Sequence, residues 1–86
     1  MVAARRFEQQ SREFRANLHR IRSHDRDTFL LILDIVDEIR QDPTCGQDCG
    51  GNLFIRREQN VSVLYQFIPA KNRLFFDDVN AVFEKW

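Results

Sequence analysis

The hydrophobic positions of the chain follow a helical period in the first half and a period of two in the second half. The segment from Arg5 to Arg22 contains no Gly or Pro and is rich in residues that favour helix. Its large apolar residues recur at spacings of seven, four and three, which places them on one helical face: Phe7, Phe14, Leu18 and Ile21. We therefore predict a first helix over Arg5 to Arg22.

A second helix is predicted from about Asp27 to Gln41. Its core stripe is expected to contain Phe29, Ile32, Leu33, Val36 and Ile39. Three further apolar residues widen this stripe, so we expect burial on more than one side: Leu30, Leu31 and Ile35. The helix should end at residues 42–43 because Pro disfavours helix in the residue before it. Ser23 or Asp25 can cap the second helix, and the short polar turn there predicts an antiparallel helical hairpin.

After a loop over residues 44–52, polar and apolar residues alternate as in β-strands. We predict three strands at residues 53–58, 61–68 and 73–79, which are separated by turns at residues 59–60 and 69–72. A short closing helix is predicted at residues 80–86. The predicted fold class is α+β. It consists of an N-terminal helical hairpin packed on a three-stranded antiparallel meander, with a short C-terminal helix, in a single domain over residues 1–86.

Charge is balanced overall but unevenly distributed. The chain has 13 basic and 13 acidic residues, whereas nucleic-acid-binding domains usually have a basic net charge. Residues 1–24 contain six Arg and two Glu, and residues 25–51 contain two Arg and seven acids. The Arg-rich first helix is therefore either a surface for phosphate or an acidic partner, or a solvated face that complements the acidic second helix.

The chain termini and cysteines narrow the class of protein. The N-terminus has no apolar run of signal-peptide length. The longest apolar run, Phe29 to Leu33, is too short for a membrane span, so we expect a cytoplasmic protein. Cys45 and Cys49 have the wrong spacing for a zinc knuckle. We expect reduced loop thiols, no metal and no cofactor; a zinc site completed by the two His residues, or a local disulfide, are the alternatives.

Other residues with chemical potential lie mainly in the second half. Its only basic cluster is a candidate contact for RNA or a partner, the alternative being solvent-facing strand residues: Arg56, Arg57, Lys71 and Arg73. Asp77 and Asp78 are adjacent on a strand and point to opposite faces, so they cannot share one ion; we expect Asp78 to cap the closing helix. His19 and His24 are expected on the surface, and Tyr65 is either a catalytic phenol or a core aromatic.

Three segments carry a family resemblance: residues 53–57, 61–68 and 73–79. A hairpin whose second strand contains Tyr65, followed by a strand that begins with Arg73, resembles the RelE/ParE toxin family of bacterial type II toxin–antitoxin systems. The resemblance covers about residues 5–80, and it implies the α+β toxin fold. The family's first strand should precede the first helix. We expect it to be vestigial or missing, since only residues 1–4 are available.

The sequence departs from the family at positions that matter for RNA cleavage. Ser62 stands where the family's nucleases usually have Arg, and residues 80–86 contain no His, Arg or Tyr. Asp77 and Asp78 would repel a phosphate there. We therefore assign no catalytic residue, and we predict a toxin-like component that acts through macromolecular binding, without RNase activity.

Two alternatives to this function remain open. One is a ribosome-dependent mRNA endonuclease with a rearranged basic site, and the other is an unrelated small protein-interaction domain. The resemblance implies a cognate antitoxin as partner. The ribosome, RNA or another large target are further candidates, and no membrane partner is expected. The sequence does not decide between a monomer and a homo-oligomer.

Overall fold

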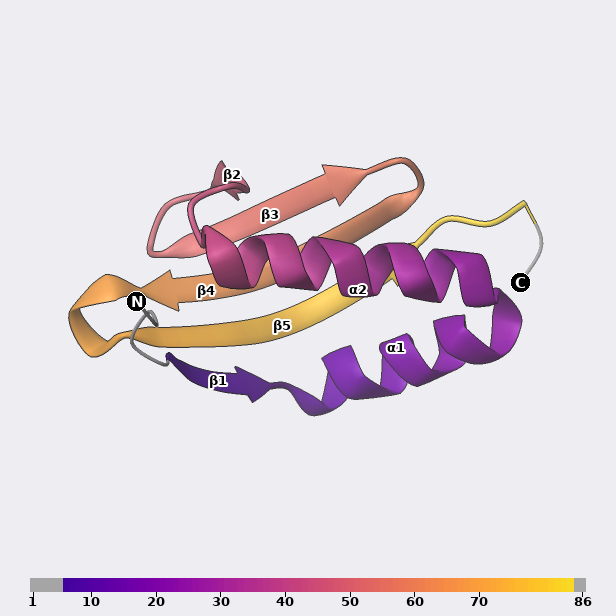
Figure 1. Cartoon of the computed structure of the whole chain (residues 1–86), viewed down its shortest axis with the longest axis horizontal. Helices are drawn as coiled ribbons and strands as arrows, with labels where there is room; N and C mark the ends of the chain where they lie inside the picture. The colour runs from indigo at the N-terminus through magenta and orange to yellow at the C-terminus, as the bar shows by residue number, and fades with distance from the viewer. Residues whose placement is uncertain (1–5, 85–86) are drawn as a thin grey trace.

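The computed structural model describes residues 6–84, which form two helices and one five-stranded sheet (Figure 1). The elements in chain order are β1 (Phe7–Gln10), α1 (Arg12–His24), α2 (Arg26–Gln41), β2 (Gln47–Asp48), β3 (Leu53–Glu58), β4 (Val61–Ile68), the 3-10 turn η1 (Pro69–Lys71) and β5 (Arg73–Ala81). The α+β class, the helical hairpin and the antiparallel β3–β4–β5 meander are confirmed. Neither described helix has the length and apolar character that a membrane span requires.

The sheet is larger than the predicted three strands. Its strand order is β1-β5-β4-β3-β2. The two-residue β2 lies inside the predicted loop and pairs with β3. β1 lies at the opposite edge, where it pairs in parallel with β5, Phe7 being opposite Arg73 and Gln10 opposite Phe76. A first strand, expected to be vestigial or missing, is therefore present, and it lies within the segment that was predicted to be helical.

The first helix begins seven residues later than predicted, because Ser11 ends β1 and caps α1. The Ser11 backbone N–H donates to the Phe76 carbonyl at 2.9 Å. Its hydroxyl donates to the Asp77 carbonyl and accepts from the Phe14 N–H. These bonds begin α1 at the residue where the pairing of β1 with β5 ends. Phe7, expected on the helical core face, is instead 72% exposed in β1.

The predicted C-terminal helix does not form over residues 80–84, and residues 85–86 lie outside the described part. β4 continues its pairing up to Val61, which is opposite Ala81. Beyond that pair, the Val82 N–H donates to the Asn60 carbonyl at 2.9 Å, and the Asn60 side-chain amide donates to the Val82 carbonyl at 3.0 Å. These bonds hold the segment extended, so Asp78 has no helix to cap.

Asp25 joins the two helices in the manner expected of a cap. Its backbone N–H closes α1 on the Ile21 carbonyl at 2.8 Å. Its carboxylate accepts hydrogen bonds from the Thr28 hydroxyl at 2.8 Å and from the Asp27 N–H at 3.1 Å, which begins α2. The hydrogen bond from Thr28 is the main cause that lowers the pKa of this carboxyl group.

The core lies between the helices and one face of the sheet. It contains Phe14, Ile21, Ile32, Ile35, Val36, Ile39, Val61, Val63, Tyr65, Leu74, Phe76, Val79 and Ala81. Leu33, predicted in the core stripe of α2, is 37% exposed, and Leu30 is 44% exposed. The expectation that α2 is buried on more than one side is wrong. The apolar period of a helix marks a wide stripe, but only the part of that stripe that faces the sheet is covered here.

Candidate functional site

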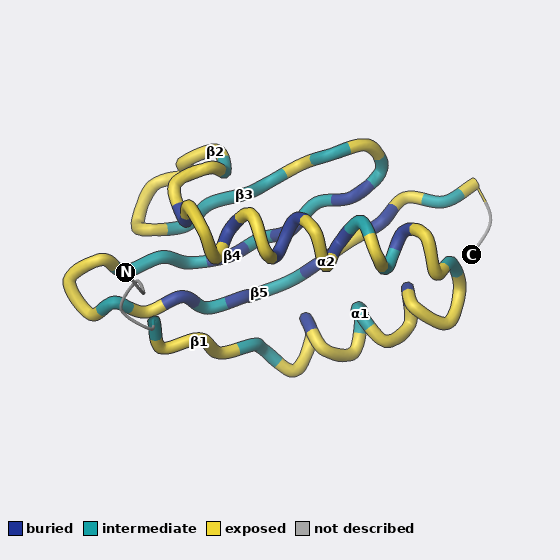
Figure 2. The backbone as a smooth tube through the Cα atoms, in the orientation of Figure 1, coloured by how far each residue is buried: buried dark blue, intermediate teal, exposed yellow. Residues whose placement is uncertain are grey.

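The two faces of the sheet differ in what covers them. Along β4, Val61, Val63 and Tyr65 are at most 2% exposed, and they pack in the core beneath the helices. The residues of β4 that alternate with them are only half-buried (Figure 2). Because side chains alternate along a strand, they point to the other side of the sheet. No helix of residues 6–84 lies on that side, since both pack against the core face. We call this surface the open face.

The strand register gives the residues of the open face, because directly paired residues point to the same side. They are Gln47 of β2, Leu53, Ile55 and Arg57 of β3, Ser62, Leu64, Gln66 and Ile68 of β4, and Arg73, Phe75, Asp78 and Asn80 of β5. Ile55 lies opposite Leu64, and Gln66 lies between Leu53 and Phe75. All of these are half-buried except four exposed polar residues: Gln47, Arg57, Arg73 and Asn80. The middle of the open face is therefore mainly apolar and in contact with solvent.

A shallow hollow of about 150 Å³ lies on this face. It is lined by Ile55, Ser62, Leu64, Asp78, Val79 and Asn80. The pairing of β4 with β5 shifts its register between Leu64 and Tyr65 of β4, as in a β-bulge. The Asp78 carboxylate accepts from the side-chain amide of Asn17 in α1 and from the Val79 N–H, each at 2.8 Å. Three of the lining residues are apolar and three are polar, one of them the acidic Asp78, and none is basic.

The four basic residues singled out in the sequence do not meet at one place. Arg56 lies opposite the buried Val63 and points to the helix side. Its guanidinium is 2.9 Å from the Glu38 carboxylate, which raises the pKa of Arg56. Arg57 lies opposite Ser62, whereas Arg73 lies opposite Ile68, next to Lys71 of η1. The two positions are six residues apart along β4, which is about 20 Å along the strand.

The remaining candidates for chemistry lie outside the open face. Cys45 and Cys49 are exposed and unpaired thiols, and His19 and His24 are exposed on α1. Within residues 6–84, no group of three His, Cys, Asp or Glu residues is placed to hold a metal ion.

The sequence left two interpretations of Tyr65, a catalytic phenol or a core aromatic, and the structure shows a buried core aromatic. Its hydroxyl donates to the Pro43 carbonyl at 2.8 Å and accepts from the Gly46 N–H at 3.0 Å. The ring stacks on Phe54 with centroids 5.5 Å apart. Burial raises the pKa of Tyr65 to about 12. A phenol held in this way anchors the loop after α2 to the sheet and is not positioned to transfer protons to a ligand.

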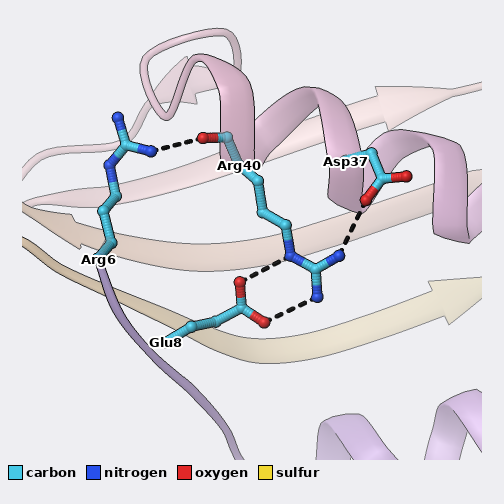
Figure 3. A network of polar contacts seen from close by, with 4 residues as sticks. All are labelled: Arg6, Glu8, Asp37 and Arg40. Carbon is cyan, nitrogen blue, oxygen red and sulfur yellow. Dashed lines mark hydrogen bonds and ion pairs between the residues drawn. The ribbon is translucent and has the colours of Figure 1, made fainter. Parts of the chain in front are cut away.

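A polar network that the sequence did not predict holds β1 to α2 (Figure 3). The Arg40 guanidinium makes a two-bond contact with the Glu8 carboxylate, at 2.7 and 2.8 Å, and a third bond with Asp37 at 2.9 Å. Arg6 donates to the Arg40 carbonyl at 2.5 Å. The spacing of Asp37 and Arg40 on α2 is local, but no spacing signals the contacts of Arg40 with Glu8 and Arg6, because these residues come from a distant segment. It lies on the helix side and leaves the open face free.

No protein-family model and no curated protein sequence matches the chain. Three solved structures share its fold at 12% sequence identity. The RelBE2 toxin–antitoxin complex of Mycobacterium tuberculosis gives a TM-score of 0.75 over 92% of this chain and 100% of that chain. The intact E. coli RelBE complex gives 0.74 over 93% and 100%, and the isolated E. coli RelE toxin gives 0.75 over 94% and 88%. The chain therefore has the RelE-type fold.

Proposed function

We propose that the chain is the toxin-like component of a bacterial toxin–antitoxin pair, which binds a cognate antitoxin and acts through macromolecular binding without RNase activity. The observation that carries the proposal is an open face with an apolar centre and a carboxylate-bearing hollow, on a RelE-type fold. Two of the similar structures are toxin–antitoxin complexes, which supports an antitoxin as the partner.

The chemistry of the hollow argues against RNA cleavage. Cleavage needs cations beside the scissile phosphate and a group that moves the proton of the 2′-hydroxyl. Ser62 and Leu64 supply neither, and the fixed Asp78 carboxylate would repel a phosphate. Arg56 is held by Glu38 on the other side of the sheet. A phosphodiester placed in the hollow would therefore lack both charge stabilisation and an acid or base.

The apolar centre of the open face suits a protein segment. Pairing across three strands brings together four apolar residues: Leu53, Ile55, Leu64 and Phe75. Such a surface gains free energy when an amphipathic helix or an extended segment covers it. Arg57 lies at the end of this surface beside the hollow, where it can pair with an acidic residue of the partner at the rim.

The first test is binding of the protein encoded by the adjacent reading frame. We expect Leu64→Glu to raise the Kd of the complex roughly 10- to 100-fold, because a buried charge replaces an apolar contact. Leu30→Glu is the matched control, since Leu30 is exposed on α2 and should leave the Kd unchanged. Isothermal calorimetry with purified components measures both. A neighbouring product that does not bind, or equal losses for the two variants, would contradict the proposal.

The second test concerns RNA cleavage. Primer extension on translated messages after induction is expected to show no codon-positioned cuts. Ser62→Arg alone should not create them, because Asp78 still lines the hollow. Cuts by the unmodified protein that disappear in Arg57→Ala or Arg73→Ala would instead establish an endonuclease with a rearranged basic site.

A further inference from the structure

Helix α1 carries a line of exposed basic side chains on its outer surface. Arg12, Arg15, His19 and Arg22 follow one another at spacings of three, four and three residues, and all four are exposed. Residues at these spacings are neighbours along one side of a helix. We call these four residues the basic stripe. From its first to its last residue, α1 rises about 15 Å.

Within residues 6–84, no acid of α2 forms an ion pair with this stripe. Asp37 pairs with Arg40, and Glu38 pairs with Arg56. Among residues 6–84, neither Arg12 nor Arg15 makes an ion pair, and the Arg22 guanidinium lies 5.5 Å from the ring centroid of Phe29. The charge of the stripe is therefore available to a ligand. This favours the first of the two sequence interpretations, a surface for phosphate or an acidic partner, over a solvated face that complements α2.

The surroundings of the stripe favour phosphate over a protein partner. Protein interfaces have an apolar, often aromatic, core. The large hydrophobic residues that are exposed in the described part are Phe7, Leu30, Leu33 and Val82, none of which is on α1. Binding to a nucleic-acid backbone needs only cations and hydrogen-bond donors, and the planar guanidinium group matches the phosphate group in two-bond contacts.

We propose that the basic stripe of α1 binds the phosphodiester backbone of a nucleic acid, without sequence preference. The stripe lies on α1 and not on the open face, so this inference does not depend on the proposed function. A net charge of zero for the whole chain is compatible with it, because the basic residues gather in one helix and the acidic residues in another. Three arginines in line can contact about three phosphates of one strand.

The experiment measures fluorescence anisotropy of a labelled RNA hairpin, a DNA duplex of the same sequence and labelled poly-glutamate, at about 50 and 200 mM salt. Arg12→Gln/Arg15→Gln should weaken nucleic-acid binding at least about 10-fold at the lower salt. It should also reduce the slope of log K against log salt by about 1.4 to 1.8, since each of the two lost phosphate contacts contributes about 0.7 to 0.9. Circular dichroism establishes that the variant is folded.

The matched control compares two single variants, Arg15→Gln in the stripe and Arg26→Gln at the start of α2, which each remove one positive charge from an exposed side chain. Arg26→Gln should leave the affinity and the salt slope nearly unchanged. Equal losses in the two single variants would overturn the proposal, because binding would then reflect overall charge. Absence of binding at the lower salt, or stripe-dependent binding of poly-glutamate as tight as that of the nucleic acids, would also overturn it. A preference between RNA and DNA supports the proposal and identifies the backbone.

Discussion

Replacing Phe76 with Ala is expected to lower the free energy of unfolding by about 3–5 kcal/mol. Phe76 is fully buried in β5, where its ring centroid is 5.3 Å from that of Phe14 and 6.3 Å from that of Tyr65. Its removal leaves a cavity where α1 packs on the sheet. The preceding residue in the chain, Phe75, points to the open face instead. Phe75→Ala should therefore cost less than about 1.5 kcal/mol, because it leaves no enclosed cavity.

Urea unfolding followed by circular dichroism compares the two variants. A domain of this size has a total stability on the order of 5–10 kcal/mol, so Phe76→Ala can leave the chain largely unfolded. Phe76→Leu provides a milder change, with an expected loss between those of the two Ala variants. If the two Ala substitutions cost the same, the assignment of the two faces of the sheet is wrong.

Raising the pH from 10 to 12 is expected to remove about 2 kcal/mol of stability through Tyr65. Burial raises its pKa to about 12 in the folded protein, whereas an unfolded tyrosine titrates near pH ~10. The folded state thus binds the phenolic proton more tightly. This contribution is complete below pH ~10 and is lost as the pH rises through the folded pKa. Tyr65 is the only tyrosine, so absorbance of its phenolate follows the titration directly.

Tyr65→Phe is the control for this result. It should lack this part of the alkaline loss of stability. At neutral pH it should cost about 1–3 kcal/mol, because the Pro43 carbonyl and the Gly46 N–H lose their partner. A phenol that titrates near pH ~10 while the protein is still folded would contradict the buried hydrogen bonds.

The sequence predicted the elements whose signals are local. The helical period, the Asp25 cap and the Pro43 stop define the hairpin, and alternation defines β3 to β5. β1 was missed because the segment Phe7–Gln10 is polar and mostly exposed, and it becomes a strand only by pairing with a distant partner. The prediction of a C-terminal closing helix was wrong for a related reason. Pairing with Val61 and Asn60 extends β5 and the residues after it, and no local propensity reports that pairing.

The candidate site was predictable to a similar extent. Alternation alone places Leu53 and Ile55 on one face of a strand, so an apolar open face was accessible from the sequence. The distribution of the basic residues was not, because the distance between Arg57 and Arg73 depends on their positions opposite β4. Leu33 shows the same limit, since the apolar period does not tell which part of a stripe will be covered.

The pairing of β1 with β5 makes this domain slow to complete as the chain is synthesised. Ser11, at the end of β1, bonds to a residue 66 positions further along the chain. Contacts at such separations raise the contact order, which slows folding. Until β5 has been made, β1 has no strand to pair with, and the cap of α1 lacks its bonds to Phe76 and Asp77. A chain released before residue 73 therefore lacks the strand that joins β1 to β4, and the sheet is complete only after β5 has been made.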